Sequence, residues 1–219
     1  MSLTLLGVDT YDIEGYERLK KYLEIVQPNK LILNITSDDF GQDLKYLKQA
    51  KEYVENEIDS LPKKYLKTAI KKYIDTSNFV TLNAINYYKT RANHTTMLFT
   101  NIPLEPRLPK LPLNMDSKKF YTNLLATSYT IAKLIKEQRV KEYGTFSQTI
   151  TVKDRFSIPD YSQENIEKLA KSIEVNHNNG DTTTVIGHQI PLIEYTDLSD
   201  RIKHLNPHKV SLEDMDNYL

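Results

Sequence analysis

The chain has 219 residues, 39% hydrophobic and 26% charged, which predicts a folded protein of one substantial domain or two small ones. Lys+Arg and Asp+Glu both number 29, and this net charge of zero argues against a nucleic-acid partner or an acidic membrane surface. The absence of cysteine excludes disulfides, thiolate metal sites and a cysteine nucleophile, and no apolar run is long enough to predict a transmembrane helix. Because an apolar strand is predicted almost from Met1, we expect no signal peptide and an intracellular protein.

The first forty residues predict a strand, a helix and a second strand. Residues 3–8 are apolar, residues 12–26 have helical spacing, and the sequence Gln-Pro-Asn ends that helix before a second apolar run. Two buried strands joined by one crossover helix lie parallel, so we expect an α/β fold whose small central sheet contains a parallel βαβ unit. The strand ends should then fall side by side at the carboxyl edge of the sheet, where α/β proteins place their ligands. The polar residues there are Asp9, Thr10, Asn34 and Thr36.

A helical middle section is predicted over residues 42–142. Amphipathic stripes indicate helices at residues 42–59, 62–74 and 77–100, and Asp116 caps a further helix that ends near residue 142. Between them, residues 103–113 hold four of the nine prolines and predict an extended crossing or a linker.

The last third of the chain predicts shorter elements. Residues 148–153 alternate and indicate a strand or an extended segment, and residues 161–175 indicate a helix. A β-branched strand at residues 182–186 ends in Gly187 and His188. Two short helices are expected to finish the chain, the second opened by Ser211 and Asp214 at capping-box spacing.

Three features could carry chemistry, although each also has a structural interpretation. A basic helix could contact phosphates, but its apolar stripe favours a solvated face; its lysines are Lys63, Lys64, Lys67, Lys71 and Lys72. The PxxP spacings at 103–113 could dock as polyproline II, but are more typical of a spacer. A histidine that follows a strand, as His188 does, can be a metal ligand or a general base, or belong to a turn.

Short motifs at both ends of the chain resemble the TraB/PrgY/Tiki superfamily. The N-terminal match consists of LLGVDT, the helix YDIEGYERLKKYLEIV and the run QPNKLILNIT. The C-terminal match consists of VKDRF, which contains Arg155, and TTTVIGHQIPLIEY after a helix. KTRANHTTM, which contains Arg91, competes for the arginine segment, but the distance from Arg155 to Gly187 fits the family better. The resemblance implies one TraB-like α/β domain over residues 1–219.

Active branches of this family are thought to depend on a divalent metal, held by histidines in two glycine-histidine turns and a glutamate on the second strand. This chain has Asp9-Thr10-Tyr11 at the first turn and Asn34 in place of the glutamate. An asparagine cannot act as a general base near neutral pH. Only His188, Asp9 and either Asp38 or Asp39 are left as metal or acid/base candidates.

These observations lead to three hypotheses. The first is a non-catalytic TraB-like binding or scaffold module without a cofactor, which binds a protein or a small polar ligand. Its site would be lined by Asp9, Thr10, Asn34, Thr36, Arg155 and His188, with Arg155 neutralising an acidic group. The second is a metal-dependent hydrolase or peptidase in which Asp9 and His188 hold the ion and Asp38 or Asp39 is the base. The third, a nucleic-acid-associated protein, would use the lysine helix.

Overall fold

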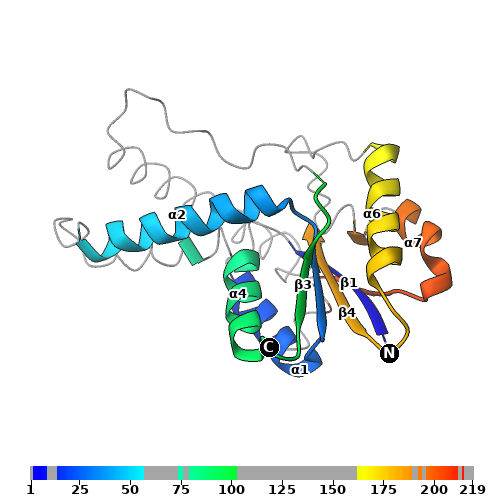
Figure 1. The fold of residues 1–219 in the computed structure, drawn as a ribbon, viewed down its shortest axis with the longest axis horizontal. Coiled ribbons are helices and arrows are strands. Elements are labelled where there is room, and N and C mark those ends of the chain that lie inside the picture. Colours follow the sequence, from blue (N-terminus) through cyan, green and yellow to red (C-terminus); the bar gives the residue numbers. More distant parts are fainter. Residues whose placement is uncertain are drawn as a thin grey trace, which may run out of the picture.

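One parallel β-sheet with helices on both faces forms the computed structural model of this chain (Figure 1). The structure describes residues 2–8, 14–56, 74–75, 79–102, 162–188, 192–193, 196–211 and 214. The strands are β1 (Ser2–Val8), β2 (Lys30–Leu33), β3 (Thr96–Phe99), β4 (Thr182–His188) and β5 (His208–Val210). The helices are α1 (Gly15–Val26), α2 (Ser37–Asn56), α4 (Phe79–Arg91), α6 (Gln163–Asn176), α7 (Thr196–Arg201) and the 3-10 helix η4 (Lys203–Leu205). The predicted α/β fold is therefore confirmed.

The strand order is β3-β2-β4-β1-β5, and every pairing is parallel. β1 and β2 lie parallel, as predicted, but they are not neighbours. β4 lies between them and pairs with β1 along its whole length, from Ser2↔Thr182 to Val8↔His188. The expectation that the ends of β1 and β2 lie side by side was therefore wrong. A crossover helix fixes the parallel direction of two strands but leaves room for another strand between them.

Alternating side chains of the sheet build two apolar layers. One face packs against α1 and α4, and its strand residues include Leu6, Val8, Leu33 and Ile186. The other face packs against α6 and α7, and its strand residues include Leu3, Leu5, Ile32 and Val185. Figure 1 shows α1 and α4 on one side of the strands and α6 and α7 on the other. Apolar residues on both faces are what a fully covered parallel sheet requires.

Local signals explain where the first and sixth helices end and begin. α1 ends because Gln27 adopts a left-handed conformation (φ 47°) and donates its backbone N–H to the Leu23 carbonyl. Pro28 follows directly, so the predicted break at Gln-Pro-Asn is confirmed. α6 begins where Ser162 accepts a hydrogen bond from the Asn165 backbone N–H, one residue from the predicted start.

Two short strands were missed in the sequence. The predicted helix at residues 77–100 is α4 only as far as Arg91, and residues Thr96–Phe99 form β3 instead. The predicted helical middle section therefore contains a strand. β5 was also missed, and it lies between η4 and the Ser211 turn. Strands of three or four residues are too short to show a reliable alternation, so only pairing with β2 and β1 reveals them.

The predicted capping box at Ser211 is confirmed. The Ser211 backbone N–H donates to Asp214 Oδ2 (2.8 Å), and the Asp214 backbone N–H donates to Ser211 Oγ (3.2 Å). Among the helices that the structure describes, none combines the length and apolar character needed to cross a bilayer.

Candidate functional site

The carboxyl end of β4 is the best-placed ligand site in the sheet. β1 leads to α1, and β2 leads through α2 to α4, so both chains continue on the α1/α4 face. β4 leads to α7, which packs on the opposite face. Gly187 and His188 therefore lie between two strands whose chains leave the sheet in the other direction. Ligands of open α/β sheets bind at such switch points.

Asn34 lies directly against this strand end. Its backbone N–H donates to the Ile186 carbonyl (2.8 Å), and its side-chain Oδ1 accepts a hydrogen bond from Thr100 Oγ1 (2.9 Å). A Cβ on Gly187 would lie 2.8 Å from Asn34 Cβ and 2.9 Å from Leu192 Cδ1, so only glycine fits there. The structure thus brings together Asn34 and the Gly187 turn, two features that the sequence singled out separately.

Thr36 and Asp39 form the start of α2. Thr36 Oγ1 donates to Asp39 Oδ2 (2.7 Å), and the Asp39 backbone N–H donates to Thr36 Oγ1 (3.0 Å). This reciprocal pair is a capping box, with aspartate in the place of the usual glutamate. A helix cap therefore accounts for both residues, whereas the neighbouring Asp38 is an exposed carboxylate.

Two residues of this edge were missed because the segment was interpreted as helix. Thr100 and Asn101 follow β3 as Asn34 to Thr36 follow β2. Asn101 has a left-handed backbone (φ 55°), and its Oδ1 accepts the Ser37 backbone N–H (3.1 Å). The signal was a four-residue apolar run followed by small polar residues, which is the same pattern that correctly predicted β2.

Several predicted site residues fall outside the described part of the chain. These are Asp9, Thr10, Arg155, the lysine helix and the proline-rich segment 103–113. For His188 the backbone alone is described, and its pairing with Val8 aligns the ends of β4 and β1. The predicted proximity of the Asp9 and His188 side chains stays a prediction.

The described residues do not fit the metal site that the resemblance implies. The position expected to hold a glutamate is Asn34, whose buried amide oxygen accepts a hydrogen bond from Thr100. The Asp39 carboxylate is engaged by Thr36. Within the described ranges, no three His, Asp or Glu residues form a group that could hold a metal.

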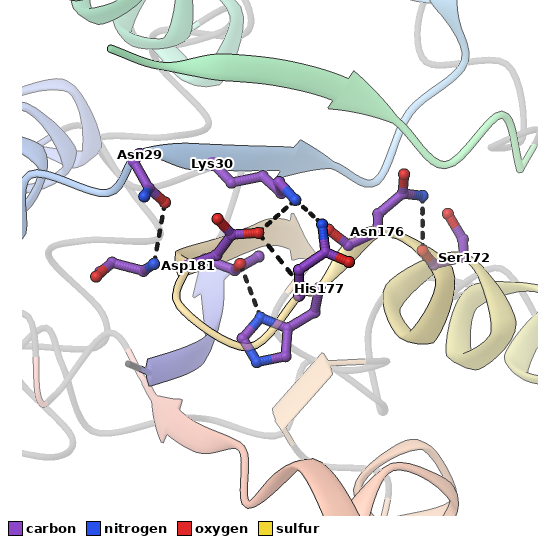
Figure 2. A network of polar contacts seen from close by, with 9 residues as sticks. Asn29, Lys30, Ser172, Asn176, His177 and Asp181 are labelled. Atoms are coloured by element: carbon purple, nitrogen blue, oxygen red, sulfur yellow. Dashed lines mark hydrogen bonds and ion pairs between the residues drawn. The ribbon is translucent and has the colours of Figure 1, made fainter.

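A second polar cluster lies at the opposite, amino edge of the sheet (Figure 2). Lys30 Nζ donates to Asp181 Oδ2 (2.5 Å) and to the Asn176 carbonyl (2.6 Å), so the start of β2 is tied to the end of α6 and the turn before β4. The hydrogen bond from Lys30 holds the pKa of Asp181 below its ordinary value. The cluster joins three elements at the edge away from the switch points, which indicates a structural role.

His177 belongs to the same cluster. Its Nδ1 lies 2.9 Å from Thr183 Oγ1, and Figure 2 shows the ring beside the turn that carries Asp181. Burial lowers the pKa of His177, while Asp181 raises it and Lys30 lowers it further. A lowered pKa favours the neutral imidazole in the folded protein.

Comparison with known proteins gives no relative. No protein-family model matches the chain, and no curated protein or solved structure matches it either. Membership of the TraB superfamily therefore stays a prediction based on the motifs.

Proposed function

We propose that this protein is a divergent TraB-like module that binds a small polar ligand without chemical turnover. The observation that supports this most is the position of the β4 end between two strands whose chains leave on the opposite face. The described polar side chains around it are Asn34, Thr100 and Asn101. They donate and accept hydrogen bonds but carry no charge that would serve acid/base chemistry. The lack of cysteine supports an intracellular setting.

One observation favours a metal-dependent hydrolase as the second candidate. The register Val8↔His188 pairs the last residue of β1 with the last residue of β4, so Asp9 directly follows the residue opposite His188. Asp9 and His188 are the donors that this candidate needs, with the exposed Asp38 as the base in preference to Asp39.

A thermal-unfolding screen separates the two candidates. The wild-type chain, His188→Ala and the control His94→Ala, which changes an exposed histidine, are unfolded with a panel of polar metabolites and with Mn²⁺, Co²⁺ or Zn²⁺. A ligand at about 100 times its dissociation constant stabilises a fold by about 2.7 kcal/mol. We expect metabolites, and not metals, to raise the melting temperature. A metal response present in wild type and His94→Ala but lost in His188→Ala, together with turnover, would favour the hydrolase instead.

A further inference from the structure

A buried arginine lies on α1 at the level of the candidate site. Tyr22 OH lies 3.4 Å from Thr184 Oγ1, which fixes the part of α1 that faces β4. Arg18 is one turn earlier on the same helical face, about 6 Å nearer the start of α1. About 6 Å along β4 from Thr184 is the distance to Ile186, because a strand rises about 3.3 Å per residue. Side chains of a helix also lean toward its start, so the Arg18 guanidinium extends toward the end of β4.

The burial of Arg18 contrasts with the weakness of its ion pair. Arg18 is 2% exposed, whereas the side chain of its partner Glu14 is 39% exposed. Arg18 Nη2 lies 3.5 Å from Glu14 Oε2, while Lys30 and Asp181 approach to 2.5 Å in the same chain. A good charge-assisted hydrogen bond is about 2.7–2.9 Å long, so this pair is loose. Loose pairs four residues apart on a partly exposed helix are weak and readily exchanged.

A purely structural role does not explain the choice of arginine. Burying a guanidinium has a large desolvation cost, and an apolar side chain of similar volume at such a position is often as stable or more stable. Arginine is the preferred residue where a carboxylate is bound through two parallel hydrogen bonds. The group that now lies beside Arg18 is a carboxylate, and its own side is open to solvent.

We propose that Arg18 binds the carboxylate of a small acidic ligand at the end of β4, and that Glu14 is the internal group that this ligand displaces. The inference rests on the proposed binding function and names its ligand class. Glu14 then lowers the affinity by competing for the same guanidinium. Arg18 also supplies a cation at this edge within the described residues, a role that the sequence had given to Arg155.

The test is a titration of the ¹⁵N-labelled full chain with sodium succinate, with sodium chloride and inorganic phosphate at matched ionic strength. Glu14→Gln removes the competitor and should lower the succinate dissociation constant by at least about twofold. Glu17→Gln is the matched control, because it removes the same charge from an exposed position on the same helix. It should leave the dissociation constant unchanged. Arg18→Lys keeps the charge, loses the paired geometry and should weaken binding about tenfold.

The outcomes separate this inference from the proposed function. Equal succinate affinity in wild type and Glu14→Gln, or no succinate binding at all, would overturn the role of Arg18. Neutral metabolites that still bind at the β4 end would leave the binding module standing in that case. Tighter binding of phosphate than of succinate, with the same gain in Glu14→Gln, would overturn the assignment to a carboxylate. If Arg18→Lys does not fold, the comparison of Glu14→Gln with Glu17→Gln still decides.

Discussion

Gly187 is the residue at which the candidate site tolerates least change. An alanine methyl there would lie within 3 Å of both Asn34 Cβ and Leu192 Cδ1, from opposite faces of the sheet. We expect Gly187→Ala to lower the free energy of unfolding by about 1–3 kcal/mol, the usual cost of overpacking. Urea unfolding measures this difference.

Gly41→Ala is the matched control for that substitution. Gly41 lies in α2 with no atom within 4 Å of an added Cβ, and it is exposed. Alanine is the better helix former, so this variant should be more stable than wild type by about 0.5–1 kcal/mol. Equal changes in the two variants would show that the β4 end is not tightly packed.

His177 predicts a pH-dependent stability. Because burial lowers its pKa in the folded chain, the unfolded chain binds the proton first as the pH falls. The contribution of His177 is therefore complete above its ordinary pKa of 6.5 and is lost as the pH falls below that value. We expect the unfolding free energy to decrease between about pH 8 and pH 5, and to decrease less in His177→Asn. Asparagine keeps a polar atom near Thr183 but does not titrate.

The comparison variant is His94→Asn, which changes an exposed histidine. It should keep the wild-type dependence on pH. If His177→Asn also keeps it, the buried imidazole does not produce the effect. Asp181, whose pKa is lowered from 3.8, contributes in a separate and more acidic range, where its stabilising effect is lost as the carboxylate is protonated.

At the scale of elements, the start of α2 depends on one side-chain pair. Thr36→Ala removes the hydroxyl that both accepts the Asp39 N–H and donates to its carboxylate. We expect a loss of about 1 kcal/mol in urea unfolding, as for other helix caps, and near wild-type stability for Thr36→Ser, which keeps the hydroxyl. A Thr36→Ser variant as unstable as Thr36→Ala would show that the methyl group, not the cap, matters.

The elements that the sequence predicted correctly are those with strong local signals. α1 and α6 carry clear apolar stripes and recognisable ends at Gln27 and Ser162. β1, β2 and β4 are apolar or β-branched runs bounded by polar turns. β3 and β5 have three or four residues and are stabilised by pairing with distant strands, so no local pattern could reveal them.

At the scale of the whole molecule, the sequence predicted the location of the site better than its composition. The carboxyl edge followed from the βαβ unit alone, but the insertion of β4 between β1 and β2 depends on contacts about 150 residues apart. Asn34 and the Gly187 turn were predicted as separate site features, whereas their contact was not. Arg18 escaped attention because its burial depends on the packing of α1 over β4, which no local signal reports.

The measurement that tests the central claim most directly is the mapping of ligand-induced amide shifts by NMR on the ¹⁵N-labelled chain. A polar metabolite that stabilises the protein is added, and the perturbed amides are assigned to the sheet. We expect them to cluster at the carboxyl edge, at residues 33–36, 100–101 and 186–188. A cluster at the amino edge, around Lys30 and Asp181, would contradict the proposed site, because that network lies at the opposite ends of the same strands.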